Sequence, residues 1–351
     1  MRYSGQNKIF NHDNTCEIIA EVANTHEGDF QKFKKLIKLV SETGCNNIKY
    51  QIFNPEELMI FSHGEFDLLK SYCFSNEQWY EIGQLSKNLN LNVYCDIFDK
   101  SSLNIAKSID PKGYKVHSTN IDDEEFLNQV AVSTNKVILS TGGCYLSEIT
   151  NAVKFIINAN SSIEIFLMTG IQNFPTLLSD TQLNRIYELK NIFIDSKNVK
   201  FGLQDHISGD DDMAFILPFI ARTMNYQIIE KHITIDRSKK EEDYFSSLNP
   251  NEFKKLMENW KKFPLIFGNG EIPKTVLSKE EKQYRLFSKK YAVCKIDLKK
   301  GSKIDLQNFI FRRIDKDKEG LTRQGFSKLI GKTLNKSLKK NDIMYKNFIN
   351  E

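Results

Sequence analysis

The sequence predicts an α/β protein, a (β/α)8 barrel followed by a small β-rich domain. The first observation is a pattern repeated before Pro264, in which a short β-rich run, a loop and an amphipathic stretch follow one another. The second is the number of these units, because eight of them in about 250 residues match the period and size of such a barrel. The third is the loss of this pattern from Leu265 onward. A doubly wound sheet is the alternative, although it rarely needs eight regular units.

The barrel elements are predicted from hydrophobic periodicity, with strands and helices alternating along the chain. The predicted strands are Glu17–Val22, Asn47–Ile52, Leu91–Asp96, Gly113–His117, Lys136–Thr141, Ile163–Met168, Val199–Leu203 and Gln227–Ile233. The predicted helices are Phe30–Glu42, Asn76–Leu89, Ser101–Ile109, Asp123–Ser133, Ser147–Asn158, Asp180–Ile194, Asp210–Met224 and Pro250–Lys262. Residues suited to an N-cap stand at or before several helix starts; they are Ser75, Asp123, Asp180 and Asn249.

The residues after the barrel predict a linker and a second domain. Leu265–Lys282 is irregular, and Gly268-Asn269-Gly270 and Pro273 are typical linker residues. A strand-rich module of about 65 residues follows, too small for much chemistry of its own; the stretches that together indicate it are Tyr291–Lys295, Lys299-Lys300-Gly301, Phe309–Arg313 and Lys332–Ile343. The predicted boundaries are 1–265 for the barrel, 266–285 for the linker and 286–351 for the second domain.

Composition excludes several classes of protein. No apolar run approaches the roughly 18 residues of a membrane span, and the polar N-terminus lacks the apolar centre of a signal peptide. Six cysteines occur without CxxC pairs, which argues against a zinc cluster and favours reduced thiols. No GxGxxG fingerprint or phosphate-loop motif is present. We therefore expect a cytoplasmic protein that does not associate with membranes.

Charge is unevenly distributed along the chain. From Leu286 onward there are 17 Lys and Arg against 7 Asp and Glu, a net +10 that leaves −6 for the remainder of a chain with a total of +4. A basic tail can bind nucleic acid, but the aromatic and basic residues do not interleave as they do on nucleic-acid platforms. We expect no nucleic-acid partner. The tail is instead expected to dock on an acidic partner domain or to help neutralise an anionic substrate.

Two histidines are the strongest candidates for chemistry. Two apolar runs, joined by a stretch suited to a crossover helix, each end on a histidine, His206 and His232. This order predicts a βαβ unit, and neighbouring parallel strands lie roughly 5 Å apart. Both imidazoles could then reach one metal ion at about 2.1 Å. Glu230 shares the face of His232, because side chains alternate along a strand. The alternative is two unrelated histidines, one in a loop and one in the core.

Other polar residues fall on predicted strands or directly after them, and the active sites of barrels lie at the C-terminal strand ends. Polar residues facing a barrel interior are costly unless they are satisfied or useful. Two inward lysines, Lys49 and Lys136, predict an anion site for phosphate or carboxylate; the alternative is two snorkelling surface lysines. The further candidates are Glu21, Gln51, Ser140 and Gln172.

Several motifs together resemble the sialic acid synthase family. They are Ile19-Ala20-Glu21-Val22-Ala23-Asn24-Thr25-His26-Glu27-Gly28-Asp29, Ile48-Lys49-Tyr50-Gln51, Val137-Ile138-Leu139-Ser140-Thr141-Gly142, Phe174-Pro175-Thr176, Asp205-His206, Glu230-Lys231-His232 and Glu242-Asp243-Tyr244-Phe245-Ser246. The tail resembles the antifreeze-like (SAF) module of that family in Tyr291-Ala292-Val293, Asp297-Leu298-Lys299-Lys300-Gly301 and Leu329-Ile330-Gly331-Lys332. Each motif is weak alone, but their order and the two-domain layout are specific, and they cover nearly the whole chain.

The resemblance implies an enzyme, a transferase that joins phosphoenolpyruvate to an N-acetylated hexosamine. It implies that His206 and His232 bind a divalent ion, manganese or magnesium, and that Lys49 and Lys136 hold phosphoenolpyruvate. Glu21 would lie near the metal's water or near the reacting carbons, with Gln51, Ser140 and Glu230 lining the same mouth, and Asp243 would take sugar hydroxyls. Arg313 from the small module would reach the sugar in a partner subunit, which implies a domain-swapped homodimer.

The chain departs from the family pattern where the sugar is expected. Ser118-Thr119-Asn120 stands in place of Ser-Gly-Asp or Ser-Gly-Glu, and Phe174 in place of tyrosine. Asp243-Tyr244 replaces Asp-His after Glu241-Glu242 instead of Gly-Pro, and Arg313-Ile314 replaces Arg-Pro. We therefore expect an acceptor other than N-acetylmannosamine, such as a 6-deoxy diacetamido sugar. Two alternatives are a related phosphoenolpyruvate-dependent synthase or aldolase on another aldose, and a non-catalytic sugar-binding relative.

Overall fold

The computed structural model describes residues 16–267, 276–315 and 317–349. These residues fall into two compact units, one within residues 1–267 and the other within residues 268–351. Each unit has a hydrophobic core of its own. In the described parts of the chain, no helix has the length and apolar character needed to cross a membrane. All six cysteines are free thiols.

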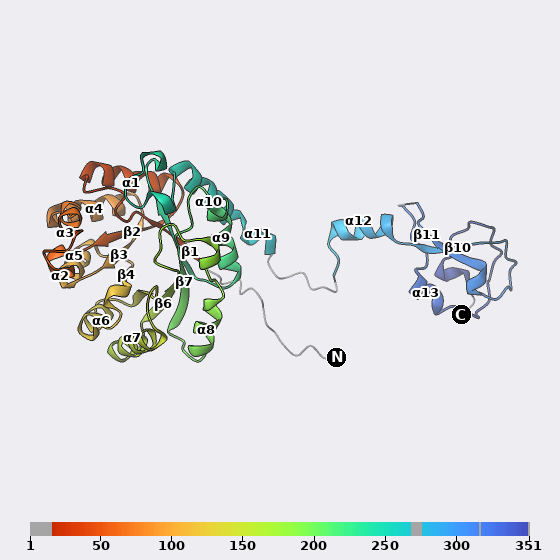
Figure 1. Cartoon of the computed structure of the whole chain (residues 1–351). Helices are drawn as coiled ribbons and strands as arrows, with labels where there is room; N and C mark the ends of the chain where they lie inside the picture. Colours follow the sequence, from red (N-terminus) through yellow and green to blue (C-terminus); the bar gives the residue numbers. More distant parts are fainter. Residues whose placement is uncertain (1–15, 268–275, 316, 350–351) are drawn as a thin grey trace. The chain divides into compact units, whose positions relative to one another are not determined.

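Eight parallel strands close the first unit into a barrel, which confirms the predicted (β/α)8 fold (Figure 1). Each strand pairs with the next along the chain, and β8 pairs with β1 so that His232 lies in register with Glu21. A short strand, β9 (Ser247–Leu248), pairs with the end of β8. The barrel strands are β1 (Glu17–Glu21), β2 (Asn47–Ile52), β3 (Asn92–Ile97), β4 (Gly113–Val116), β5 (Lys136–Ser140), β6 (Glu164–Thr169), β7 (Val199–Asp205) and β8 (Ile228–Ile233).

Helices cover the outside of the barrel (Figure 1). In the first of them, α1, the buried residues recur at the three- and four-residue spacing of one helical face; they are Phe33, Leu36, Ile37 and Val40. The helices of this unit are α1 (Phe30–Glu42), α2 (Pro55–Leu58), α3 (Phe66–Ser71), α4 (Asn76–Asn88), α5 (Lys100–Ile109), α6 (Glu124–Ala131), α7 (Leu146–Ala159), α8 (Arg185–Ile192), α9 (Met213–Thr223), α10 (Pro250–Lys262) and α11 (Pro264–Phe267). Short 3-10 turns occur at η1 (Ser118–Asn120), η2 (Leu178–Asp180), η3 (Arg237–Lys239) and η4 (Tyr244–Ser246).

Two differences from the predicted helices concern loops after strands. The short helices α2 and α3 lie between β2 and α4, where no helix was predicted. The helix predicted from Asp180 begins only at Arg185, because Asp180 ends the 3-10 turn η2 and does not cap α8. Both differences lie in the loops that follow β2 and β6, on the side of the barrel where the polar residues gather.

Inward-facing side chains fill the barrel in layers. On β1, Glu17 lies at the N-terminal end, Ile19 in the middle and Glu21 at the C-terminal end. The middle layer is a separate apolar cluster formed by Ile19, Tyr94, Ile138, Phe166, Met168 and Ile228. Gly202 leaves room for this layer, because a Cβ there would lie 2.1 Å from the Met168 sulfur. The barrel is therefore a packed core with an apolar middle layer and polar side chains at both ends.

The second unit is small and mostly irregular. Its antiparallel strands β10 (Tyr291–Cys294) and β11 (Phe309–Arg312) match two predicted strands, and its remaining elements are α12 (Lys279–Ser288), α13 (Arg323–Ser327), η5 (Leu306–Asn308) and η6 (Lys346–Phe348). The strand character predicted for Lys332–Ile343 was wrong, because these residues make only isolated bridges such as Leu298–Leu338. Residues 279–288 form a capped helix where an irregular linker was predicted. Gly268-Asn269-Gly270 and Pro273 lie outside the described residues.

Candidate active site

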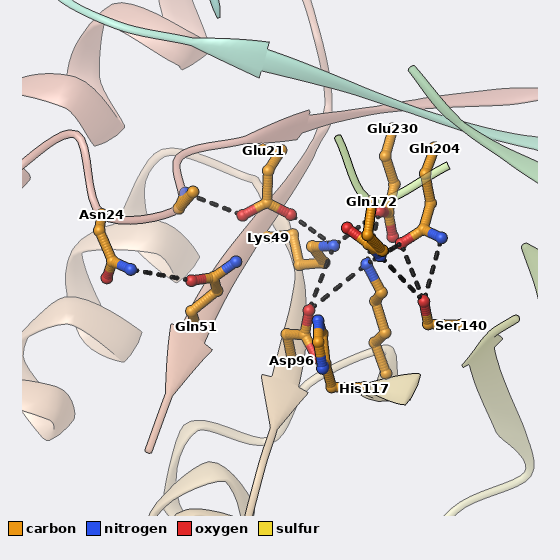
Figure 2. A network of polar contacts seen from close by, with 12 residues as sticks. Glu21, Asn24, Lys49, Gln51, Asp96, His117, Ser140, Gln172, Gln204 and Glu230 are labelled. Atoms are coloured by element: carbon orange, nitrogen blue, oxygen red, sulfur yellow. Dashed lines mark hydrogen bonds and ion pairs between the residues drawn. The ribbon is translucent and has the colours of Figure 1, made fainter. Parts of the chain in front are cut away.

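A cluster of buried charged side chains lies at the C-terminal end of the barrel (Figure 2). Lys49 on β2 places its Nζ 2.5 Å from Glu21 Oε2 and 2.7 Å from Glu230 Oε2. Lys115 on β4 lies 2.8 Å from the same Glu230 oxygen. Asp96 on β3 stands between the lysines, at 3.6 and 3.4 Å. One carboxylate from β8 is thus shared by two ammonium groups, one from β2 and one from β4.

Burial sets the charge state of this cluster, since all five residues are at most 4% exposed. Burial lowers the pKa of Lys49, and the Glu230 carboxylate offsets only part of that effect. Burial also acts to lower the pKa of Lys115, but Glu230 and Asp96 outweigh it and raise that pKa above its usual range. Burial acts to raise the pKa of Glu230, and the two lysines outweigh it and hold the pKa low. Glu230 is therefore ionised and Lys115 is charged at neutral pH.

His206 and His232 form a pair beside this cluster, as predicted from the two apolar runs. Their ring centroids are 5.2 Å apart, and Phe174 packs edge-on against His206 at 4.4 Å. The Nδ1–H of His206 donates to the Ile171 carbonyl at 3.1 Å, which leaves its Nε2 free of a proton. Burial lowers the pKa of His206 to about 4 and moves the pKa of His232 well below its ordinary value.

The histidine pair fits a divalent ion. Both imidazoles are neutral at pH 7, as metal ligands must be. Nδ1 of His232 is buried and has no hydrogen-bond partner in the described part of the chain. The cluster alongside holds three carboxyl groups against two lysines, which also favours a cation. Among the described residues no three His, Cys, Asp or Glu side chains group as ligands, so the protein would supply two ligands and leave the other positions open.

Uncharged donors line the side of the mouth between β5 and β7. Gln204 Nε2 donates to Ser140 Oγ at 3.0 Å, and Gln172 Nε2 donates to the same oxygen at 3.2 Å. The Gln204 side-chain oxygen accepts from Lys115 at 2.8 Å, which connects this group to the charged cluster. Amides and a hydroxyl beside two lysines form a surface suited to anionic oxygens. Ser140 and Gln172, both predicted from the sequence, therefore lie together.

Three predicted or neighbouring polar residues meet at the rim above β1 and β2. Asn24 Nδ2 donates to Gln51 Oε1 at 3.2 Å, and the Asn24 backbone N–H donates to Asp243 Oδ2 at 3.2 Å. Burial raises the pKa of Asp243 to about 6. Gln51 and Asp243 thus converge from β2 and from the loop after β8 through Asn24. Amide and carboxyl groups of this kind bind hydroxyl groups readily.

Lys136 lies apart from the other predicted site residues. It faces the barrel interior as predicted, but it lies at the N-terminal end of β5, with Ile138 of the apolar layer between it and Ser140. Its Nζ is 4.0 Å from Glu17 and 5.1 Å from the Phe166 ring centroid. Four residues along a strand span about 13 Å, so Lys136 cannot join the cluster at the other end. The structure thus does not bring Lys136 to the cluster, where Lys115 stands beside Lys49 instead.

Three members of the cluster were given no role from the sequence, although Asp96 and Lys115 fall at predicted strand ends: Lys115, Asp96 and Gln204. Each lies within three residues of the C-terminal end of its strand, on the inward face, and that position is the signal that could have found them. The strand register shows which of these residues are neighbours. Gln51 pairs with Asp96, Asp96 with Lys115, and Gln204 with Glu230 on neighbouring strands. Arg313 belongs to the second unit, where its guanidinium lies 5.6 Å from the Phe287 ring centroid. Its contact with a sugar in a partner subunit stays a prediction.

Comparison with known proteins adds an independent line of evidence. The sequence profile of the NeuB family matches residues 36–272. Pseudaminic acid synthase from Campylobacter jejuni is 27% identical to this chain, over 95% of this chain and 97% of that protein. N,N'-diacetyllegionaminic acid synthase from Legionella pneumophila is 27% identical, over 92% of each. The crystal structure of an N-acetylneuraminic acid (sialic acid) synthetase from Leptospira borgpetersenii in complex with citrate superposes with a TM-score of 0.67 at 28% identity, over 78% of this chain and 92% of that chain.

Proposed function

Because this chain belongs to the NeuB family of sialic and nonulosonic acid synthases, we propose that it condenses phosphoenolpyruvate with an N-acylated hexosamine and releases phosphate. The single observation that carries this proposal is the arrangement at the barrel mouth, where paired imidazoles adjoin two lysines bridged by one carboxylate. Such a site can hold a cation and an anion next to each other, as this condensation requires.

The proposed reaction forms one carbon–carbon bond and replaces the C2–oxygen bond to phosphate by a C2–oxygen bond to the added water. C3 of phosphoenolpyruvate attacks the aldehyde carbon of the open-chain sugar, water adds at C2, and the resulting tetrahedral centre expels phosphate. A divalent ion, manganese or magnesium, held by His206 and His232 would supply Lewis-acid polarisation of the aldehyde oxygen.

The side chains of this protein have distinct tasks in the proposal. Lys49 and Lys115 neutralise the anionic groups of phosphoenolpyruvate, and the donors of Ser140 and Gln172 orient its oxygens. Glu230 fixes both ammonium groups from one side, so that charge is in place before the substrate arrives. Glu21, 2.5 Å from Lys49, is the carboxylate placed to hold a proton near the reacting carbons.

We propose an acceptor sugar other than N-acetylmannosamine, with Gln51 and Asp243 binding its hydroxyl groups. The support is that Phe174, without a hydroxyl, packs against His206 at the mouth, and that two similar proteins are named for pseudaminic and N,N'-diacetyllegionaminic acid. A 6-deoxy diacetamido hexosamine is the proposed class. Turnover of N-acetylmannosamine alone would reject this part of the proposal.

The second unit is proposed to be an antifreeze-like (SAF) domain that a linker joins to the barrel. This domain is proposed to be exchanged between the subunits of a homodimer. Arg313 would then contact the sugar in the partner's barrel. The motifs of the tail and its +10 charge, set against −6 for the rest of the chain, support this arrangement. A cytoplasmic location is part of the same proposal, supported by six free thiols.

Phosphate release tests the proposal. The protein is incubated with phosphoenolpyruvate, Mn²⁺ and a panel of N-acylated hexosamines, and inorganic phosphate is measured together with the nine-carbon product. We expect sugar-dependent release that a chelator abolishes, and no release from a His206→Ala variant that keeps the melting temperature of the wild type. Sugar binding without phosphate release from any panel member would reject the enzyme and favour a non-catalytic sugar-binding protein.

A further inference from the structure

A buried ion pair lies directly behind the two histidines, on the outer face of the barrel. Lys231 Nζ is 3.0 Å from Asp205 Oδ2, and both side chains are 0% exposed. The two residues are paired in register between β7 and β8. Each precedes one histidine in the sequence, Asp205 before His206 and Lys231 before His232.

The surroundings of this pair make its presence unexpected. The neighbouring outward residues on the same strands are apolar and belong to the main core; they are Leu203, Ile207, Ile229 and Ile233. Two charges removed from water in such a layer gain little net stability, since an apolar pair of the same volume is often as stable or more so. Stability therefore does not explain the pair, and a role in fixing strand register is the best-attested alternative.

The pair is connected to the backbone of His206. The second oxygen of Asp205, Oδ1, accepts a hydrogen bond from the backbone N–H of Ile207 at 3.0 Å. The carbonyl of His206 accepts from the Thr176 backbone N–H and from Ser246 Oγ, both at 2.8 Å. The chain is thus held immediately before, at and after His206, and the part before it is tied to Lys231 on the neighbouring strand.

Register matters here because it decides which way each side chain points. Slipping one strand by a single residue past its neighbour exchanges the inner and outer faces. Asp205 opposite Lys231 on the outside places His206 and His232 one step further on the inside, where their ring centroids are 5.2 Å apart. We propose that Asp205 and Lys231 are positioning residues that hold the two imidazoles in the relative position needed to share one divalent ion. This rests on the metal site of the proposed function.

Mn²⁺ affinity of full-length variants tests the role. In Asp205→Leu/Lys231→Met both charges are replaced by apolar groups of similar volume, so the protein is expected to keep a melting temperature close to that of the wild type. The dissociation constant for Mn²⁺, measured by calorimetry, is expected to rise about 10–100-fold, the usual range for residues that orient metal ligands. A folded double variant that binds Mn²⁺ as tightly as the wild type overturns the proposal.

The matched control is Glu164→Leu/Lys200→Met. This pair also joins neighbouring strands, β6 and β7, but at the N-terminal end of the barrel. It should leave Mn²⁺ affinity unchanged, and an equal loss in this variant would mean that any cross-strand ion pair matters. If the Leu/Met variant does not fold, Asp205→Asn/Lys231→Met carries the test, because its amide oxygen can still accept from Ile207 N–H.

Histidine NMR without metal separates this proposal from the proposed function. In protein labelled with ¹⁵N-histidine, the Nδ1–H tautomer of His206 reports its bond to Ile171 and thus its position. We expect the signals of both His206 and His232 to shift in the double variant and to stay unchanged in the control. Unchanged signals in the double variant overturn the positioning role, even if the wild type binds Mn²⁺. Absence of Mn²⁺ binding by the wild type would instead reject the metal part of the proposed function, and the NMR result would still decide the role of the pair.

Discussion

Lys115 and Lys136 both point into the barrel from neighbouring strands, yet only Lys115 lies at the end where the charged cluster gathers. Lys115 is held by Glu230 and Gln204, and Asp96 lies 3.4 Å away. Lys136 lies on the other side of the apolar layer, close to Glu17. Two lysines on the same inward face thus differ in their surroundings, because they lie at opposite ends of the barrel.

Lys115→Met is expected to lower kcat/KM for phosphoenolpyruvate by about 10²–10³-fold, because a fixed charge aimed at the substrate is lost. It is also expected to cost about 3–5 kcal/mol of stability, since Glu230 and Asp96 lose a buried partner. Steady-state kinetics and thermal unfolding measure both effects. Lys136→Met is the matched control and should change both only slightly, because its ion pair is long and partly exposed. Equal losses in the two variants would contradict the assignment of Lys115.

Asp243 should make stability depend on pH. Its pKa is about 6 in the folded protein because burial raises it from 3.8. The unfolded chain therefore releases this proton at lower pH, and the contribution of Asp243 to stability, complete below about 3.8, is lost as pH rises through about 6. Asp243→Asn removes this loss and keeps an oxygen for the Asn24 N–H.

The difference in melting temperature between Asp243→Asn and the wild type is accordingly expected to grow in favour of the variant between pH 4 and pH 7. Thermal unfolding in buffers of equal ionic strength measures it. If the difference in melting temperature is the same at both pH values, ionisation of the buried Asp243 carboxyl does not lower the stability of the folded protein.

At the scale of elements, helices α4 and α8 show when a polar residue before a helix stabilises it. Ser75 Oγ accepts from the Gln78 N–H at 3.3 Å, and Gln78 Oε1 accepts from the Ser75 N–H at 2.9 Å, which is a complete capping box. Asp180, equally suited by residue type, caps no α-helix. Ser75→Ala is expected to cost about 1 kcal/mol and about 2–4 °C in melting temperature. Asp180→Ala should cost close to nothing, and a loss equal to that of Ser75→Ala would contradict this reading of the loop.

Elements that depend on local periodicity could be predicted from the sequence, whereas contacts that depend on the pairing of strands could not. Strands and long amphipathic helices could be predicted within a few residues, because their periodicity depends on burial that the barrel requires everywhere. The histidine pair could be predicted because each imidazole ends an apolar run. The mutual contacts of Lys115, Asp96 and Gln204 could not, because they depend on register between strands, and register is fixed only by three-dimensional pairing. Residues 279–285 were predicted as linker but belong to helix α12, although Ser278 and Glu281 form the same capping box as in α4.

At the scale of the whole molecule, the separation of the chain into two units raises the question of which subunit completes a site. The barrel carries His206, and the second unit carries Arg313. The proposed exchange of second units between subunits means that each site combines the barrel of one chain with Arg313 of the other. Opposite net charges on the two parts of the chain favour such an association at low ionic strength.

Complementation between two inactive variants tests this exchange. His206→Ala and Arg313→Ala are each expected to lose most of their activity as homodimers, and the two proteins are unfolded and refolded together in equal amounts. Half of the random dimers are then mixed, and in each of them one site has an intact barrel facing an intact arginine from the other chain. We expect roughly a quarter of wild-type phosphate release in the mixture. If Arg313 serves the barrel of its own chain, every site in every dimer lacks one of the two residues, and the mixture stays as inactive as its components.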